Sequence, residues 1–248
     1  MNIPEDHPRY RSLMARERLA DMVKDGLVTP TGMISHGRGE AFDYLMGERT
    51  LDSALKAEKA ATAFLLNAEN PVICVNGNAA ALDPERIIEL AGKVEAKIEV
   101  NIFHRTEERM ELLISHMEKA GAKNVLGRDP DARIPGISSD RALCTKEGIF
   151  DSDVILVPIE DGDRAQALAA MGKTVIAIDL NPLSRTSAAA SVSIADEMSR
   201  ALENMIGFSG MKRKEIGDSI SGFDNVSNLR DTVEEICRNL RSQFEGKI

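Results

Sequence analysis

The sequence predicts an α/β protein: a Rossmann-like parallel sheet flanked by helices and preceded by an N-terminal helical annex. Two observations predict this fold class. From Pro71 onward, short apolar runs rich in β-branched residues alternate with amphipathic helical segments, the pattern of successive βαβ units. Before Pro71, apolar residues recur at helical spacing instead. We therefore expect one domain, 1–248, with an annex (1–70), a nucleotide-binding core (71–206) and a C-terminal helical region (207–248).

The annex is predicted to contain helices at 8–25 and 50–67. In the second helix apolar residues recur every three to four positions, and Thr50 is placed to cap the first turn. Between the helices, the segment 36–40 is rich in glycine and charge, so we expect a loop there.

The core is predicted to contain five strands joined by helices. Each helix has a readable start: Asp83 with Pro84 behind it, Thr106 followed by two acids, and Asp161 before an alanine-rich stretch. The predicted strands are 72–75, 98–103, 153–158, 174–179 and 191–196.

Two further segments complete the chain. Residues 128–150 contain prolines and glycines without a clean period, so we expect a loop over one end of the sheet. Residues 227–244 alternate charged and apolar side chains, which predicts a helix that faces solvent or another subunit.

Composition excludes several function classes. The chain has 40 acidic and 31 basic side chains, a formal net charge of -9, so no general attraction to nucleic acid phosphates is available. An anionic substrate must instead meet a few locally placed arginines or lysines. We saw no leader and no apolar run long enough for a membrane span, and we expect a cytoplasmic protein.

The three cysteines, Cys74, Cys144 and Cys237, are far apart and lack C-x-x-C spacing. This usage fits a reducing compartment and disfavours a zinc site. We expect buried or inert thiols and no bound metal at these positions.

Polar residues follow the predicted strands, where parallel sheets bind ligands. After the first strand, Asn76-Gly77-Asn78 would let backbone N–H groups approach an anion. An ordinary strand-to-helix turn explains the same residues equally well. The G-x-G-x-x-G fingerprint and the G-x-x-x-x-G-K-[ST] loop are both absent.

Arg105 precedes Thr106, a predicted helix cap, where the helix dipole and a guanidinium together favour phosphate or carboxylate. The alternative, a surface ion pair with Glu107 or Glu108, has equal weight.

Asp179 ends the most apolar strand, and a carboxylate there can accept hydrogen bonds from ribose hydroxyls or a base amine. The loop that follows, 181–186, adds an amide, hydroxyls and a cation, which favours a nucleotide loop. A plain polar turn hinged at Pro182 remains the alternative.

His36 lies beside Gly37 and Gly39, which flank Arg38 and would let that side chain and the backbone face a ligand. His36 is a candidate general base, but a structural histidine is the more frequent case. No serine or cysteine nucleophile motif accompanies it, so we propose no catalytic triad.

A series of motifs runs along most of residues 1–205: N-I-P-x-x-H-P-R-Y (2–10), H-G-R-G-E-A-F-D-Y-L (36–45), N-G-N (76–78), N-I-F-x-R-T-E-E-R (101–109), E-D-G-D-R (160–164), M-G-K (171–173) and I-D-L-N-P-L-S-R-T-S (178–187). Together, in this order, the motifs resemble one family, the archaeal 4-phosphopantoate:β-alanine ligases or phosphopantothenate synthetases.

The resemblance implies a Rossmann-like homodimer that joins 4-phosphopantoate to β-alanine and converts ATP to AMP and pyrophosphate in coenzyme A biosynthesis. The implied ATP contacts are Arg16, Arg38, Asp179, Leu180, Asn181, Arg185, Thr186, Asp196 and Glu197.

From strand-end position we infer phosphopantoate contacts at Asn76, Asn78, Asn101 and Arg105. Arg38, His36 and Arg105 are the candidate catalytic residues. Residues 128–150 and those after 207 match no motif.

The implied chemistry suits these residues. The substrate carboxylate would attack the α-phosphorus of ATP, release pyrophosphate and form an acyl-adenylate, which the amine then opens. Positioning and charge neutralisation by Mg²⁺ and an arginine cluster would support both steps. The cluster predicted for this task is Arg16, Arg38, Arg105 and Arg185.

Two alternatives remain at this point. The α/β pattern alone also fits an NAD-dependent oxidoreductase, although the missing glycine fingerprint counts against it. A regulator that binds ATP without turnover would use the same loops. Titration with NADH against ATP tests the first, and an AMP-release assay tests the second.

Overall fold

The computed structural model describes residues 3–7 and 9–242 of the chain. Its centre is a parallel five-stranded sheet in the order β2-β1-β5-β6-β7. The strands are β1 (Pro71–Val75), β2 (Lys97–Val100), β5 (Val154–Pro158), β6 (Thr174–Ile178) and β7 (Val192–Ile194). All five predicted strands exist, and the α/β fold class is confirmed.

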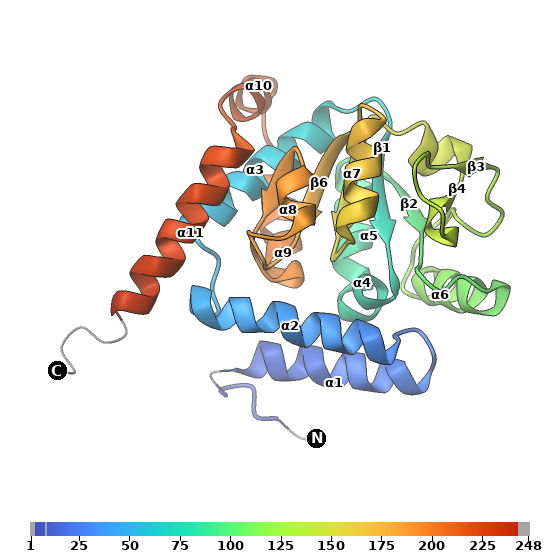
Figure 1. Ribbon diagram of the computed structural model, residues 1–248, viewed down its shortest axis with the longest axis horizontal. Coiled ribbons are helices and arrows are strands. Elements are labelled where there is room, and N and C mark those ends of the chain that lie inside the picture. The colour runs from blue at the N-terminus through green and yellow to red at the C-terminus, as the bar shows by residue number, and fades with distance from the viewer. Residues whose placement is uncertain (1–2, 8, 243–248) are drawn as a thin grey trace.

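Helices cover both faces of the sheet (Figure 1). Alternate strand residues divide between the faces: Ile73 and Leu156 belong to the larger apolar cluster, and Val72 and Ile155 to the smaller one. The larger cluster includes residues from α3 (Asp52–Asn67), α4 (Gly77–Leu82), α5 (Pro84–Lys93), α6 (Glu107–Lys119) and α9 (Met198–Phe208). The smaller cluster includes residues from α7 (Gly162–Ala170), and α8 (Arg185–Ala189) lies against α7 and β6.

Helices α1 (Tyr10–Lys24) and α2 (Pro30–Met46) lie beside the sheet at the end where α4 begins, and α2 crosses that end (Figure 1). The carboxyl ends of β1 and β5 therefore face α2. At the other end of the chain, α10 (Arg213–Ser221) and α11 (Asn225–Ser242) pack against α3. Residues 243 and 244 of the helix predicted at 227–244 lie outside the described residues, as does residue 8 at the start of the first predicted helix.

The loop predicted at 36–40 is wrong, because these residues lie in the middle of α2. Signals at both ends fix this helix: Thr29 accepts a hydrogen bond from the Gly32 amide, and Gly47 ends the helix with a φ of 84°. Between these caps, continuous backbone hydrogen bonding stabilises the helix more than Gly37 and Gly39 destabilise it.

The capping role predicted for Thr50 is also wrong. Helix α3 begins at Asp52, and Glu235 of α11 accepts from the amides of Asp52 and Ser53. The Thr50 hydroxyl instead donates to Asp196 at 2.6 Å. Sequence alone does not show that a distant glutamate completes the first turn.

The predicted strand 98–103 is too long at its end. The ladder with β1 stops at Val100, and the Asn101 side chain donates instead to the carbonyl groups of Arg141 and Leu143. Asp161 does precede α7, yet its side chain makes no capping bond and pairs with Arg141 at 3.2 Å.

The segment 128–150 is more ordered than the predicted loop. Its elements are β3 (Ala132–Arg133), the 3₁₀ turn η1 (Asp140–Ala142), β4 (Leu143–Cys144) and the π-helical turn η2 (Lys146–Phe150). Buried Glu99 anchors the segment by accepting from the amides of Thr145 at 2.8 Å and Ile149 at 2.7 Å. These hydrogen bonds hold the segment against the sheet, although its sequence has neither a helical nor a strand period.

Cys74 and Cys144 are buried, as expected, and burial raises the pKa of their thiols to about 11 and about 12. Cys237 is free and exposed on α11. Among the described helices, none combines the length and the apolar character that a membrane crossing requires.

Candidate active site

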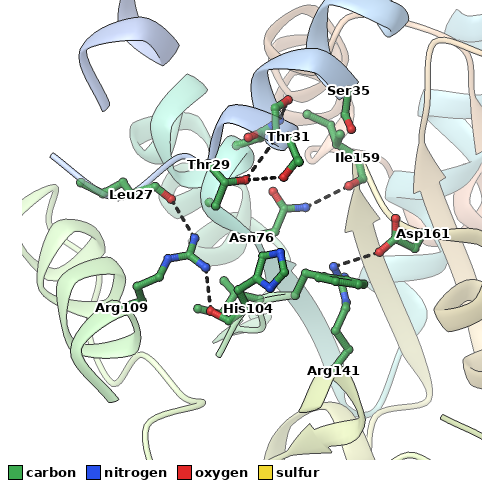
Figure 2. Close-up of a pocket in the computed structure, with 15 residues that line it drawn as sticks. Leu27, Thr29, Thr31, Ser35, Asn76, His104, Arg109, Arg141, Ile159 and Asp161 are labelled. Carbon is green, nitrogen blue, oxygen red and sulfur yellow. Dashed lines mark hydrogen bonds and ion pairs between the residues drawn. The ribbon is translucent and has the colours of Figure 1, made fainter. Parts of the chain in front are cut away.

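The strand order reverses direction between β1 and β5, which makes their carboxyl ends the topological switch point of the sheet. A cavity of about 300 Å³ opens there, beneath α2 (Figure 2). We call it the switch-point cavity. It is lined by Leu27, Thr29, Thr31, Gly32, Ser35, Asn76, Gly77, Asn78, Ile102, Phe103, His104, Arg109, Arg141, Ile159 and Asp161.

Asn76 and Asn78, two predicted substrate contacts, lie in this cavity, and their amides hold its walls together. Asn76 donates to the Ile159 carbonyl at 3.0 Å and accepts from the Ala79 amide at 3.0 Å, which caps α4. Asn78 donates to the Gly32 carbonyl of α2 at 2.9 Å. The two side chains therefore fix the relative positions of β1, β5 and α2.

Gly77 is explained by packing. A Cβ at this position would collide with the Leu27 carbonyl in the α1–α2 connection. Only glycine lets that backbone pass so close to the start of α4.

Two arginines enter the switch-point cavity from opposite sides (Figure 2). Arg109, from α6, donates to the backbone carbonyls of His104 at 2.7 Å, Leu27 at 3.3 Å and Gly26 at 3.5 Å. These are neutral acceptors, so they leave its positive charge uncompensated, and burial lowers its pKa. Such a cation can bind an anion at low desolvation cost.

Arg141 belongs to a buried ion cluster. Its guanidinium and that of the fully buried Arg164 both pair with the carboxylate of Glu160. Burial alone would raise the pKa of Glu160, but the two arginines outweigh it and hold that pKa below its usual range. With Asp161, which pairs with Arg141 at 3.2 Å, the cluster has two cations and two anions, so its charges balance while the Arg141 guanidinium is fixed at the cavity wall.

Sequence reasoning missed Arg109 and Arg141 as site residues. Arg109 closes the motif at 101–109 and lies in the first turn of a predicted helix, and this position was the available signal. Arg141 lies in 128–150, where no pattern could place it.

A second cavity, of about 240 Å³, adjoins the first and shares Ser35, Ile159 and Asp161 with it. We call it the Asp179 cavity. Seven predicted site residues line it: His36, Arg38, Asp179, Leu180, Asn181, Asp196 and Glu197. Its other residues are Gly39, Phe42, Leu82, Glu160, Ile178, Ser184 and Met198.

Asp179 organises the loop after β6. Its carboxylate accepts from the Asn181 amide at 3.0 Å and from the Ser184 hydroxyl at 2.5 Å, and Ser184 caps α8. Burial raises the pKa of Asp179, while these two donors and the positive charge of Arg38 lower it. The loop therefore holds an acceptor group at the cavity wall.

Asp196 and Glu197 form the opposite, acidic wall. Glu197 caps α9 by accepting from the amides of Ser199 at 3.0 Å and Arg200 at 3.1 Å, and burial raises its pKa. Asp196 is buried and pairs with Arg200 at 2.6 Å. The same guanidinium also pairs with Asp43 of α2 at 2.5 Å.

His36 lies between the Asp179 cavity and a third cavity of about 220 Å³ under α1. Burial lowers the pKa of its imidazole, and Glu40 opposes this shift. Within the described chain its Nε2 atom has no hydrogen-bond partner. At neutral pH the imidazole is therefore uncharged and able to accept a proton.

Arg105 and Arg185 do not join the predicted arginine cluster. Arg105 points to the far side of α6 and donates to the carbonyls of Gly127 at 2.7 Å and Arg128 at 2.9 Å. Arg185 is largely exposed, pairs with Asp163, and lines neither of the two joined cavities. The guanidinium groups of this cluster therefore do not converge at one point.

Three other predicted residues have structural contacts outside the two joined cavities. Arg16 pairs with Glu40 at 2.9 Å, and the buried Thr186 hydroxyl donates to the Glu160 carbonyl at 2.8 Å. Asn101 is buried beside the η1–β4 segment. In the described ranges, 3–7 and 9–242, no group of three or more His, Cys, Asp or Glu side chains is arranged to hold a metal ion.

The chain is similar to one protein family over most of its length. The family model described as phosphopantothenate/pantothenate synthetase matches residues 53–239. A 4-phosphopantoate–β-alanine ligase of Methanosarcina mazei is 52% identical over 245 residues, covering 97% of this chain and 96% of the relative. The ligase of Methanospirillum hungatei is 49% identical over 239 residues, covering 96% and 98%.

A third relative with the same name, from Thermococcus onnurineus, is 45% identical over 253 residues, covering 100% of this chain and 97% of the relative. The match with each relative spans both cavities and all elements of the sheet. The chain belongs to the phosphopantothenate/pantothenate synthetase family.

Proposed function

We propose that this protein is an ATP-dependent ligase that condenses 4-phosphopantoate with β-alanine to 4'-phosphopantothenate, giving AMP and pyrophosphate, in coenzyme A biosynthesis. The names of the relatives support this activity. The structural observation that carries it is the junction of two unlike cavities at Ser35, Ile159 and Asp161. One cavity is cationic and the other is largely acidic, and a reaction between two bound molecules needs such an opening between their sites.

The phosphate of 4-phosphopantoate is placed in the switch-point cavity, between Arg109 and Arg141. A phosphate dianion satisfies an uncompensated guanidinium better than any backbone carbonyl does. With its phosphate held there, the short pantoate chain extends toward the junction and brings its carboxylate to Ser35 and Asp161. Asn76 and Asn78 act by holding this cavity open.

ATP is placed in the Asp179 cavity. Asp179 and the acidic wall suit the hydroxyl and amine hydrogens of adenosine, because an ionised carboxylate accepts hydrogen bonds and cannot donate them. Arg38 lies on the same cavity and suits the phosphates. We propose that Mg²⁺ arrives bound to the nucleotide and supplies charge neutralisation, because Mg²⁺ is usually held by substrate phosphates together with one or two carboxylates.

The adenylate route explains AMP as the product. A carboxylate oxygen of phosphopantoate attacks the α-phosphorus of ATP, and the bond to pyrophosphate breaks. The β-alanine ammonium then loses one proton to a base, its nitrogen attacks the acyl carbon, the bond to AMP breaks, and the nitrogen loses a second proton to leave the amide N–H. Neutral His36 on the Asp179 cavity is our candidate for that base.

The test uses the purified protein with ATP, Mg²⁺, 4-phosphopantoate and β-alanine. We expect AMP and phosphopantothenate in equal amounts. We also expect labelled pyrophosphate to exchange into ATP when phosphopantoate is present and β-alanine is absent. Net AMP release that does not need β-alanine would point to a different acceptor, and exchange without phosphopantoate would refute the adenylate route.

We propose that the protein acts as a homodimer in the cytoplasm. In support, the apolar side chains of Ile34 in α2 and Leu183 are 72% and 76% exposed, and contact with a second copy would remove them from water. Light scattering measures the molecular mass, and a monomer at assay concentration would contradict the dimer.

A further inference from the structure

A polar cluster lies behind the acidic wall of the Asp179 cavity, where α3 faces α9. At its centre is Glu58, a side chain with no exposed surface in the middle of α3. Two side chains link Glu58 to Asp196, which lines the cavity: Asn204 donates to Glu58 at 2.8 Å and to the Thr50 hydroxyl at 3.4 Å, and that hydroxyl donates to Asp196 at 2.6 Å. Glu58 therefore lies directly behind the wall of the proposed nucleotide site without lining it.

The hydrogen bonds of the two carboxyl groups show which one is ionised. One Asp196 oxygen accepts from the Glu197 amide at 2.8 Å and from Arg200, and the other accepts from the Thr50 hydroxyl at 2.6 Å. For Glu58, Oε2 accepts from Asn204 at 2.8 Å, while Oε1 has no partner that donates to it within the described chain.

Two carboxyl groups can share a hydrogen bond only if one of them carries a proton. Asp196 has a full set of donors and a guanidinium partner, so it is the anion. A proton on Oε1 of Glu58, donated to Asp196, would give this buried oxygen the hydrogen-bond partner that it lacks.

The charges around Glu58 also favour a protonated, neutral side chain. Arg200 already pairs with two carboxylates, Asp196 and Asp43, so a third negative charge would have no counter-ion. On α11, Asp231 and Glu235 contact Lys56 and the first turn of α3 instead. The charged residues of α10 are exposed, and β5 and β7 contribute none. Burial, followed by the charge of Asp196, raises the pKa of Glu58 to about 9.

We propose that Glu58 is a positioning residue: as a neutral acid it donates to Asp196 and holds that carboxylate in the wall of the nucleotide cavity. The role deepens the proposed function, since it concerns the ATP site of the same ligase. It also predicts that an amide can replace the acid, because glutamine at this position offers an N–H donor of similar reach.

The experiment compares Glu58→Gln with Glu58→Ala by equilibrium titration with ATP at pH 7. We expect Glu58→Gln to bind within about twofold of wild type and Glu58→Ala to bind about tenfold more weakly, the usual effect of losing a hydrogen bond to a charged group. The KM for phosphopantoate should stay unchanged in both variants. ATP binding is read directly, so the outcome is independent of whether the ligase reaction itself is confirmed.

A second readout follows from the sign of the pKa shift. An acid whose pKa is raised from 4.5 to about 9 on folding stabilises the fold at low pH, and this stabilisation is lost as pH rises from 4.5 toward 9. Glu58→Gln does not titrate. Its Tm relative to wild type should therefore rise steadily between pH 5 and pH 9.

An infrared difference spectrum between wild type and Glu58→Gln at pH 7 should show the C=O band of a protonated carboxyl that the variant lacks. Absence of that band, together with a Tm difference that does not change with pH, would show Glu58 to be ionised and overturn the proposal. Weak ATP binding by Glu58→Gln would overturn it too, and this variant decides the matter even if Glu58→Ala does not fold.

Discussion

The two joined cavities differ in how they are built and in the charge they present. The switch-point cavity presents two guanidiniums. Arg109 is held by backbone carbonyls, and Arg141 is held by the buried carboxylate of Glu160. The Asp179 cavity presents carboxylates that cap helices and loops, with Arg38 as an exposed cation. Ser35, Ile159 and Asp161 line both cavities.

This contrast shows how a protein of net charge -9 can bind two highly anionic molecules. Positive charge is concentrated where a substrate phosphate must lie, and it is backed by a buried ion cluster rather than spread over the surface. Acceptors are placed where the nucleotide offers hydroxyl and amine hydrogens. Selectivity between the cavities then comes from the sign of the local charge.

The substitution with the largest expected effect on the charge difference between the two cavities is Arg109→Ala. Removing an uncompensated cation from the switch-point cavity should lower kcat/KM for phosphopantoate by roughly 10- to 100-fold, the cost of losing charge-assisted hydrogen bonds. The KM for ATP should change little. Steady-state kinetics with each substrate varied in turn measures both.

The matched control is Arg128→Ala, because the Arg128 side chain makes a surface ion pair with Glu111 of α6 at 3.2 Å and lines neither of the two joined cavities. Its kinetics should equal those of wild type. If Arg109→Ala raised the KM for ATP instead, the assignment of the two cavities would be reversed.

A pair of arginines tests the Asp179 cavity in the same way. Arg38 lies on this cavity, whereas Arg185 pairs with Asp163 outside it. Both should reduce activity while leaving the fold intact, but Arg38→Ala should raise the KM for ATP by about tenfold and Arg185→Ala by about threefold. Equal effects would mean that Arg185 leaves Asp163 to bind the nucleotide, and wild-type turnover in both variants would refute the ATP assignment.

The sequence predicted the sheet well because fully buried parallel strands leave continuous apolar runs, as in β1 and β5. It also predicted which edge of the sheet carries the polar residues. What it missed depends on distant partners: Glu235 completes the first turn of α3, and Glu99 anchors the segment 128–150. Neither contact has a local pattern.

The candidate site also combines residues that a local sequence pattern predicts with residues that it does not predict. Asp179 and Asn76 line the two cavities because they follow strands directly. Arg105 and Arg109 lie on either side of the Thr106 cap, but Arg105 donates to the Gly127 carbonyl, whereas Arg109 lines the switch-point cavity. Sequence spacing alone did not say which of the two arginines faces inward.

The smallest predicted effect concerns α2, the helix that both cavities share. The sequence suggested that the glycines around Arg38 let the backbone face a ligand, whereas the structure puts them inside a helix. A Cβ at Gly37 would meet nothing within 4 Å. Gly37→Ala should therefore stabilise the fold by roughly 0.5–1 kcal/mol through lower unfolded-state entropy, with unchanged affinity for ATP. Denaturant unfolding and ATP titration measure the two quantities, and a loss of ATP affinity would restore a direct role for that backbone in nucleotide binding.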